Sequence, residues 1–429
     1  MHTVHASLLS PGVNLTCVRT DKFKTGCLSI NLISALRRDT AALNALFPRV
    51  LRRGSEGHPD MESIASALDE LYGANIEPSV RKKGELHCAG FYADFPDDLY
   101  LPDGGNLLEK TVSLLGEMLF SPVMQGDCLR ADYTEGEKKN LIDDIRAVIN
   151  DKRSYATDRL LEEMCSREAF GINRLGREKE ARDITQESLT SHYREQVANS
   201  SIEILYCGSA EPGRVESALR SALQRLPART GAKLPGSEII LYPPPDSPRS
   251  ITEELDVSQC KLAIGFRLGK AMAAAPDYPA MMVFNTIYGS GATSKLFRNV
   301  REKLALCYYA SSAIDKHKGI MLVSSGIDYS NFGVALDEIL AQLGHVKNGE
   351  ISDWELLSAK RAVTTSIRSA MDQPSGLLEL YFDSSVSAVR YDPLNLCEMI
   401  ETVTLGRVVE TASGSSKQPP KSSRTRYIS

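Results

Sequence analysis

Three consecutive prolines, Pro243 to Pro245, interrupt the chain slightly past its midpoint. Proline fixes its own φ angle and has no backbone N–H group, so such a run cannot lie inside a helix or a central strand. The chain has 429 residues, and a single hydrophobic core seldom grows beyond about 250–300 residues. We therefore predict two domains joined by an extended linker: a first lobe over 1–230, the linker over 231–251 and a second lobe over 252–412.

The C-terminal residues 413–429 differ in composition from the lobes. They read SGSSKQPPKSSRTRYIS, a polar segment with two prolines and few apolar side chains. Such a segment buries too little apolar surface to offset the conformational entropy lost on folding. We predict that it is a disordered tail.

The overall composition is typical of a folded globular protein, with 42% hydrophobic and 24% charged residues. The net charge of -5 gives no electrostatic reason to expect binding to nucleic acid or to an anionic membrane. No segment approaches the ~20 apolar residues of a membrane span, and the N-terminus lacks the pattern of a signal peptide. The nine cysteines are scattered without a C-x-x-C pair. This pattern favours reduced thiols and a cytoplasmic location.

Apolar periodicity predicts an α+β fold. Alternating or continuous apolar runs predict strands, at 27–32, 202–207, 261–266 and 320–325. Amphipathic stretches predict helices, including 63–72, 107–119, 133–149 and 334–343. The two types are mixed without strict alternation, which favours α+β over a doubly wound parallel sheet.

The two halves of the chain are related to each other. The apolar stripe of the helix near 133–149 returns at a constant offset of 222 residues, as from Leu141 to Val363 and from Ile145 to Ile367. Arg146 and Arg368 keep the same offset, and similar strands (GCLSINL and QCKLAIGF) lie near the start of each half. We interpret this as an internal duplication.

Two segments resemble functional motifs but are incomplete. His192 and Glu195 match the start of an H-x-x-E-H zinc helix, yet Gln196 stands where the second histidine is needed. We predict an ordinary surface helix there. The stretch from Gly289 to Lys295 is similar to a phosphate-binding loop, but it lacks the glycine before and the hydroxyl residue after the lysine. A flexible turn that starts a helix is the better interpretation.

The most specific stretch of the chain is GSGATSKLFRNVREKLALCYYASS, residues 289–312. It resembles the second-lobe signature of the pitrilysin/insulinase family of zinc peptidases, a glycine-rich turn followed by S-R-L-F-x-x-(I/L)-R-E-K-x-G-L-(A/C)-Y. The matching residues are Ser294, Leu296, Phe297, Arg301, Glu302, Lys303 and Tyr308. The resemblance covers nearly the whole chain. It implies two homologous lobes, each a mostly antiparallel sheet packed with helices, that together form half of a clamshell.

The zinc helix of that family is degenerate in this chain. The resemblance places Ala45, Pro48 and Arg49 on the His, Glu and His positions of H-x-x-E-H. A further family pattern, Glu followed seven residues later by the ligating Glu, falls on Glu137 and Asp144. Alanine cannot bind zinc, proline has no carboxylate to activate water, and arginine repels a cation. The resemblance therefore implies no catalytic residues and no metal in this chain.

The second-lobe substrate-binding pair is retained. Family members use an Arg and a Tyr seven residues later to bind the substrate backbone and to steady the oxyanion, and Arg301 and Tyr308 have that spacing. With Gly289 and Gly291 of the turn, they are the predicted substrate-binding residues. The alternative is that Arg301 pairs with a nearby carboxylate and Tyr308 fills the core.

The resemblance implies a non-catalytic subunit of a heterodimeric zinc metalloendopeptidase. This chain looks like the zinc-less paralogue that accompanies a zinc-bearing one in Firmicute bacteria, a branch associated with elongation factor P modification, and like the alpha subunit of mitochondrial processing peptidase. Zinc would reside in the partner subunit, and the substrate would be an unfolded peptide. The alternative is an inert peptide-binding or scaffold protein, which could form a homodimer. No group of residues in the sequence indicates an enzyme of different chemistry.

Overall fold

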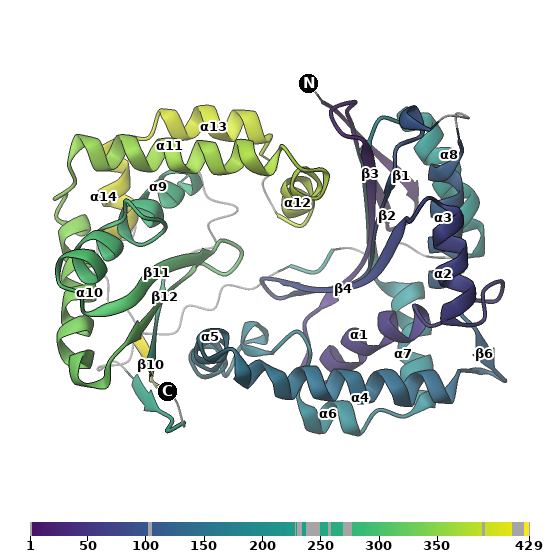
Figure 1. Ribbon diagram of the computed structural model, residues 1–429, viewed down its shortest axis with the longest axis horizontal. Coiled ribbons are helices and arrows are strands. Elements are labelled where there is room, and N and C mark those ends of the chain that lie inside the picture. Colours follow the sequence, from purple (N-terminus) through teal and green to yellow (C-terminus); the bar gives the residue numbers. More distant parts are fainter. Residues whose placement is uncertain are drawn as a thin grey trace. The chain divides into compact units, whose positions relative to one another are not determined.

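The computed structural model describes residues 2–101, 105–227, 229, 234–236, 249–255, 259–268, 277–387, 391–413 and 424–428. The chain forms two compact units, and each contains more than one stretch of sequence (Figure 1). Unit 1 consists of Met1–Arg146, Ile172–Gly236 and Ala370–Val386, and unit 2 of Ala147–Gly171, Ser237–Ser369 and Ser387–Ser429.

Unit 1 is built on a six-stranded sheet with the strand order β1-β2-β8-β3-β5-β4. The strands are β1 (Thr3–Ser10), β2 (Val13–Arg19), β3 (Thr25–Ala35), β4 (Asn75–Lys83), β5 (Leu86–Pro96) and β8 (Ser201–Gly208). The β2–β8 pair is parallel, and the other neighbouring pairs are antiparallel. Every residue of β8 is buried, because both faces of this strand are covered.

Helices cover one face of this sheet. They are α1 (Arg38–Leu51), α2 (Met61–Glu70), α3 (Leu107–Phe120), α4 (Ala131–Ala147), α6 (Glu178–Arg182), α7 (Gln186–Asn199) and α8 (Pro212–Ala222). Alternate residues of β8, such as Ile202 and Ile204, share a core with Leu46 and Phe47 of α1. The short strands β6 (Met124–Gln125) and β7 (Cys128–Leu129) and the short helices η1 (Asp98–Tyr100), η2 (Val148–Asn150), η3 (Ala169–Gly171) and η4 (Leu223–Arg225) lie in the connections of the first half.

Unit 2 is built on a five-stranded sheet with the order β11-β12-β10-β13-β9. Its strands are β9 (Arg249–Thr252), β10 (Cys260–Arg267), β11 (Cys307–Asp315), β12 (Ile320–Ile327) and β13 (Arg424–Ile428). From the second half of the chain, this unit takes the helices α9 (Tyr278–Tyr288), η5 (Leu296–Lys303), η6 (Tyr329–Asn331), α10 (Phe332–Lys347), α11 (Asp353–Ala370), α13 (Pro393–Glu401) and α14 (Leu405–Ser413).

The two sheets repeat one topology. The β13–β9 pair is parallel, like β8–β2, and β13 is followed across the sheet by β10, β12 and β11, as β8 is by β3, β5 and β4. The pairs β10–β13, β10–β12 and β11–β12 are antiparallel. Helices α4 and α11 begin at Ala131 and Asp353, the offset of 222 residues seen in the sequence. The predicted α+β fold of two homologous lobes with mostly antiparallel sheets is confirmed.

The two halves exchange one helix each. Helix α5 (Lys152–Met164) follows α4 but belongs to unit 2, where its Ala156 and Leu160 pack on Ala263 of β10. Helix α12 (Pro374–Ser385) follows α11 but belongs to unit 1, where Leu377 and Phe382 join a core with β3 and β8. This corrects the predicted boundaries of 1–230 and 252–412, because each sheet buries its second face under a helix from the other half.

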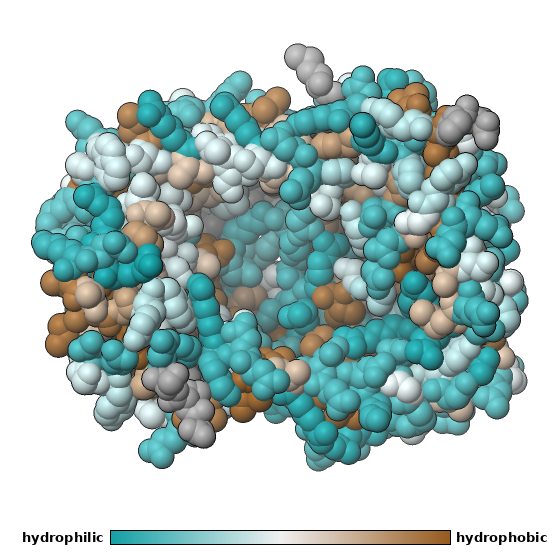
Figure 2. Space-filling model, viewed as in Figure 1, coloured by the Kyte–Doolittle hydropathy of each residue, from teal (hydrophilic) through white to brown (hydrophobic). Residues whose placement is uncertain are grey.

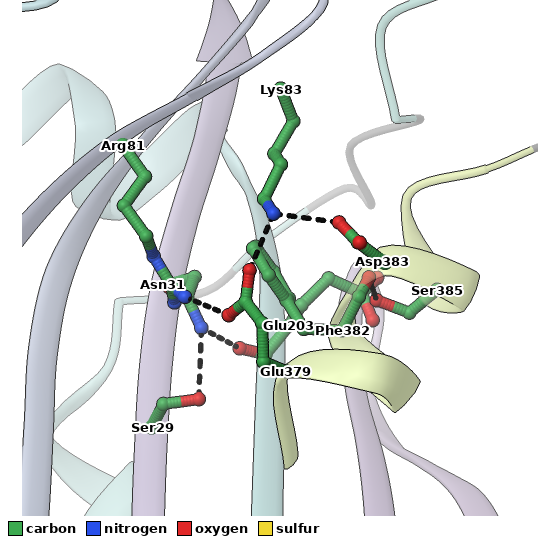
Figure 3. Close-up of polar contacts among 9 residues, drawn as sticks. All are labelled: Ser29, Asn31, Arg81, Lys83, Glu203, Glu379, Phe382, Asp383 and Ser385. Carbon is green, nitrogen blue, oxygen red and sulfur yellow. Dashed lines mark hydrogen bonds and ion pairs between the residues drawn. The ribbon is translucent and has the colours of Figure 1, made fainter. Parts of the chain in front are cut away.

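Charged groups reinforce the apolar contact of α12 with the first sheet (Figure 3). Glu379 of α12 pairs with both Arg81 and Lys83 of β4, and Lys83 also lies 2.6 Å from Asp383. Burial lowers the pKa of Lys83, but the two carboxylates outweigh it and the net pKa is raised. The Arg81 guanidinium also lies 4.5 Å from the centre of the Phe382 ring. In unit 2, the buried Glu168 that follows α5 pairs with Lys318 at 2.8 Å.

Two further sequence predictions need correction. The end of the predicted linker, Arg249 to Ile251, already belongs to strand β9; most of the rest of 231–251 lies outside the described residues. The predicted disordered tail contains strand β13, which pairs with β10 and β9. Its backbone completes the second sheet as β8 completes the first, which composition alone does not reveal.

The face of the molecule drawn in Figure 2 is mainly polar. Hydrophilic residues cover most of the face shown in Figure 2, and hydrophobic residues appear there in small groups. Within the described part of the chain, no helix has both the length and the apolar character of a membrane span.

Candidate functional site

Helix α1 carries the three positions predicted to be a degenerate zinc motif. Ala45 is fully buried, and Pro48 is buried inside the helix. Arg49 is directed to helix α4, where its Nη1 atom lies 2.7 Å from Oδ2 of Asp144. The Arg49 side chain is 21% exposed and that of Asp144 55%. The structure therefore brings together two of the residues that the sequence placed at metal-ligand positions, and joins them as an ion pair.

A second ion pair connects the same region with α4. Arg53, two residues beyond the end of α1, places Nη1 3.2 Å from Oε1 of Glu137. The Glu137 side chain is 12% exposed, and the Arg53 guanidinium also lies 5.3 Å from the centre of the Tyr133 ring. Glu137 and Asp144 are seven residues apart, two helical turns, so they lie on one face of α4. Each carboxylate on this face is neutralised by its own arginine.

This arrangement does not fit a zinc ion. Zinc needs nitrogen, sulfur or oxygen ligands at about 2.0–2.3 Å, and Ala45 and Pro48 offer no side-chain donor. The Arg49 guanidinium has donors only and carries the charge that a cation would bring. Among the residues that the structure describes, no three acidic, histidine or cysteine side chains gather as a metal ion requires.

A buried hydrogen-bonded chain lies beside the degenerate motif, and the sequence did not reveal it. The Oδ1 atom of Asn44 lies 2.8 Å from Nε2 of His192 in α7, and its Nδ2 lies 3.1 Å from Nδ1 of His87 in β5. The predicted surface position of His192 is wrong, since this side chain is 5% exposed. Burial lowers the pKa of His87 and of His192 to about 4. Both histidines are therefore neutral at pH 7. In this state the His192 Nε2–H can donate to the Asn44 Oδ1 atom, and the His87 Nδ1 atom can accept from the Asn44 Nδ2–H.

The glycine-rich turn of unit 2 is held by close packing. A Cβ atom on Gly289 would lie 2.4 Å from Oγ of Ser312, and the Ser312 N–H donates to the Gly289 carbonyl at 3.0 Å. Gly291 has φ of +108°, which favours glycine. Ser294 Oγ accepts a hydrogen bond from the Phe297 N–H at 3.3 Å and so helps to cap η5.

The lysine of this turn does not face a phosphate site. Lys295 is directed inward, and its Nζ atom lies 2.9 Å from Oε1 of Glu355, with both side chains about one-tenth exposed. The lysine of a phosphate-binding loop reaches the phosphates of its ligand instead. The structure thus agrees with the interpretation of Gly289–Lys295 as a turn that begins a helix.

Arg301 lies on the π-helical η5, with its guanidinium 4.6 Å from the centre of the Phe297 ring. Its Nη1 atom is 3.3 Å from Oε1 of Glu302, and its side chain is 40% exposed. Stacking on an aromatic ring fixes a guanidinium while leaving its N–H groups available for hydrogen bonds. Arg301 therefore contacts the carboxylate of an exposed neighbour and still reaches solvent.

Tyr308 lies at a β-bulge and is accessible to solvent. In the β11–β12 ladder, Cys307 pairs with Ile327 and Tyr309 pairs with Gly326, so Tyr308 is the extra residue. Its side chain is 56% exposed, and the alternative in which Tyr308 fills the core is wrong. Burial raises the pKa of the Cys307 thiol, and the positive charge of Arg301 opposes this rise. The charge of Arg301 is therefore felt at the residue next to Tyr308. The turn between them passes through Ala305, which has φ of +50°.

Comparisons with known proteins identify the family. The sequence pattern described as "Peptidase M16 inactive domain" matches residues 183–363. The "Probable inactive metalloprotease YmfF" of Bacillus subtilis (strain 168) is 34% identical over 399 residues, which cover 93% of this chain and 92% of that protein.

Solved structures show the same fold over the full length. A conserved protein from Enterococcus faecalis V583 superposes with a TM-score of 0.87 at 26% identity, over 99% of this chain and 98% of that one. A chain of complex III2 from Candida albicans gives a TM-score of 0.76 at 16% identity, over 99% and 96%. The chain therefore belongs to the pitrilysin/insulinase (M16) family of peptidases and their homologues, and it is a peptidase homologue that is inactive on its own.

Proposed function

We propose that this chain is the non-catalytic subunit of a two-chain zinc metalloendopeptidase, in which it binds unfolded peptide and lends Arg301 and Tyr308 to the partner's active site. The observation that carries the proposal is a contrast between the two units. The metal-ligand positions of unit 1 are neutralised by the Arg49–Asp144 ion pair. The substrate-side pair of unit 2 remains accessible, with Arg301 40% and Tyr308 56% exposed.

Ala45, Pro48, Arg49 and Asp144 are, in this proposal, the remains of a metal site. Arginine at the second histidine position replaces the charge of a cation, and Asp144 keeps a carboxylate to pair with it. The local fold thereby retains an attraction between α1 and α4 after the metal is lost.

The proposed chemistry at Arg301 and Tyr308 is oxyanion stabilisation. Zinc in the partner subunit would polarise the scissile carbonyl group. Arg301 supplies charged N–H donors, held in place by the Phe297 ring, and the Tyr308 hydroxyl supplies a further donor. Donors placed where negative charge develops stabilise the transition state, and loss of one such donor reduces the rate by about 10²–10³-fold. Gly289 and Gly291 set the turn that orients η5.

The family comparisons support a partner subunit. The Candida albicans structure that shares this fold belongs to a complex, and the resemblance to the family implies that a zinc-bearing and a zinc-less chain act together. We propose a cytoplasmic location, which the nine free cysteines support, because reduced thiols persist there.

The test is peptide cleavage by an equimolar mixture of this chain and its zinc-bearing paralogue, with an unstructured peptide as substrate. We expect Arg301→Ala and Tyr308→Phe in this chain to lower kcat of the mixture at least tenfold. The control is Arg298→Ala on the same helix, where the guanidinium lies 4.9 Å from the Trp354 ring; it should leave kcat unchanged. If Arg301→Ala and Tyr308→Phe both leave cleavage intact, the shared-site proposal fails.

An inert scaffold remains a second candidate, favoured by the contact between Arg301 and Glu302. It predicts that the chain binds peptide or itself with no effect on any peptidase. In that case Glu302→Gln would lower the thermal stability of the chain without changing cleavage by the mixture.

A further inference from the structure

Helix α5, which follows α4 in the sequence but packs in unit 2, places an arginine over two strands of the second sheet. Arg153 is exposed and lies in the first turn of α5, where the Asp151 side chain accepts a hydrogen bond from its backbone N–H at 3.1 Å. The Arg153 Nη2 atom lies 2.8 Å from Ser311 Oγ in β11, and its Nε atom lies 3.2 Å from Ser324 Oγ in β12. Ser311 and Ser324 are directly opposite each other in the β11–β12 ladder, so one guanidinium bridges the pair.

The same guanidinium lies against the ring of Tyr309 in β11, with 4.4 Å to the ring centre. The ring also rests on β12: Tyr309 is directly opposite Gly326, and a Cβ atom on Gly326 would lie 2.6 Å from the Tyr309 Cε1 atom. Glycine therefore leaves the space that the ring occupies. Lys261 of β10 lies farther away, with its Nζ atom 5.9 Å from the ring centre. The Tyr309 ring is thus held by the guanidinium of Arg153 and by the backbone of β12.

Tyr309 is the residue that follows the β-bulge. The ladder passes from Cys307, which is paired with Ile327, to Tyr309, and it leaves Tyr308 out of the pairing. The Tyr309 carbonyl accepts a hydrogen bond from Ser325 Oγ at 2.8 Å. A bulged residue takes its direction from the backbone on either side of it, because the ladder does not fix it. The orientation of the Tyr308 side chain therefore depends on how Tyr309 is held.

The docking of α5 does not depend on Arg153. Ala156 and Leu160 of the same helix are buried against Ala263 of β10, and this apolar contact holds the helix on the sheet. The Arg153 contacts lie at the surface and involve neutral partners, so they contribute only modestly to stability. A stacked, planar guanidinium with fixed hydrogen bonds does restrict where the neighbouring ring can lie. A variant without this guanidinium should therefore fold, and its effect on Tyr308 can be measured.

We propose that Arg153 is a positioning residue for Tyr308: it holds the Tyr309 ring on Gly326 and so fixes the bulge that presents the Tyr308 hydroxyl group. This role rests on the proposed function, in which Tyr308 acts in the partner's active site. Arg153 itself does not touch the substrate. The exchange of α5 thereby gains a functional consequence, because a residue from the first half of the sequence orients a substrate-side residue of the second half.

The first measurement reads the position of Tyr308 without any cleavage. The full chain is labelled with fluorotyrosine, and the fluorine NMR resonance of Tyr308 is assigned by its absence from Tyr308→Phe. We expect this resonance to shift or broaden in Arg153→Ala and in Gly326→Ala, because these changes release or displace the neighbouring ring. The matched control is Arg130→Ala, since the Arg130 guanidinium lies 4.1 Å from the centre of a tyrosine ring in unit 1; it should leave the Tyr308 resonance unchanged.

The second measurement is cleavage of an unstructured peptide by the equimolar mixture with the zinc-bearing paralogue. Arg153→Ala should lower kcat about fivefold, because a misplaced donor stabilises the transition state poorly. KM should change by less than about twofold, since the affected interaction is made in the transition state. In the Tyr308→Phe background, Arg153→Ala should change kcat by less than about twofold, because both changes act through one hydroxyl group. Tyr309→Phe keeps the ring and should retain activity, whereas Tyr309→Leu should reproduce the loss.

Circular dichroism establishes that each variant is folded. If Arg153→Ala does not fold, Arg153→Gln, which keeps a hydrogen-bonding side chain for the two serines, gives the same comparison. The proposal is overturned if the Tyr308 resonance is unchanged in the folded variant, or if kcat falls equally with and without the Tyr308 hydroxyl group. A loss of activity in Tyr308→Phe but none in Arg153→Ala refutes the role of Arg153 and leaves the proposed function intact. Full activity of Tyr308→Phe refutes the shared site, and the fluorine resonance then decides whether Arg153 holds Tyr308 in place.

Discussion

Arg49 and Asp144, 95 positions apart in the sequence, form an ion pair with 2.7 Å between Nη1 and Oδ2. The pair joins α1 to α4 at the positions where family relatives are expected to hold zinc. In the proposed account, a bound zinc ion would join ligands from both helices, and Arg49 supplies a similar attraction to the α4 carboxylate from within the chain. The ion pair therefore connects α1 with α4 at these positions.

Reversal of one charge in this pair should weaken the fold, and reversal of both should restore it. Arg49→Glu places two carboxylates together, and we expect the free energy of unfolding to fall by about 0.5–1 kcal/mol, the range for partly exposed pairs. The double variant Arg49→Glu/Asp144→Arg should recover most of this loss. Urea unfolding followed by circular dichroism measures both values, and equal midpoints for all three proteins would show no coupling between Arg49 and Asp144.

The buried histidines should make the protein sensitive to acid. An unfolded histidine binds its proton near pH 6.5, whereas His87 and His192 in the fold do so only near pH 4. Between these values the unfolded chain binds more protons, so stability falls as the pH is lowered from 6.5 to 4, by about 3 kcal/mol for each histidine. His192→Gln, which retains an amide donor for Asn44, should flatten this dependence in urea titrations from pH 7 to 4.5. An unchanged pH dependence would contradict the assigned neutral state of His192.

The turn between Arg301 and Tyr308 is strained at one residue. Ala305 has φ of +50°, a region that costs an L-residue roughly 1 kcal/mol and glycine almost nothing. We expect Ala305→Gly to raise the free energy of unfolding by up to about 1 kcal/mol. The contrasting variant is Ala65→Gly, at an exposed position in the middle of α2, which should lower stability by about 1 kcal/mol because glycine is unfavourable inside a helix. Destabilisation by both changes would argue against strain at Ala305.

The exchanged helix α12 should be essential to the core of unit 1. Phe382 is fully buried, so Phe382→Ala should lower the free energy of unfolding by about 3–5 kcal/mol. The exposed Leu394 of α13 gives a control, and Leu394→Ala should change stability by less than about 0.5 kcal/mol. Thermal unfolding by circular dichroism compares the two, and similar small losses would show that α12 contributes little to the fold.

Sequence periodicity predicts where the helices and strands of this fold lie better than it predicts which helix packs on which sheet. The strands at 27–32 and 202–207 and the helix at 107–119 lie within β3, β8 and α3, because alternation and helical periodicity report local burial. The same signals do not say which sheet a helix covers. The amphipathic α5 and α12 therefore gave no sign that each packs on the sheet of the other half.

Those residues of the candidate site that belong to a sequence motif with fixed spacing could be predicted from the sequence. Arg301, Tyr308 and the degenerate zinc positions follow from the family signature, and the structure adds the bulge at Tyr308. The chain His87–Asn44–His192 escaped prediction because its members come from β5, α1 and α7. A polar residue such as Asn44 amid the apolar positions of α1 was the single available signal for it.

The central claim is that this chain acts in peptide cleavage only together with a zinc-bearing partner. The most direct measurement is zinc content and peptide cleavage for this chain alone, for the zinc-bearing paralogue alone and for their equimolar mixture. We predict no zinc and no cleavage for this chain alone, one zinc per pair in the mixture, and faster cleavage by the mixture than by the paralogue alone. Stoichiometric zinc in this chain, or a mixture no faster than the paralogue alone, would contradict the account.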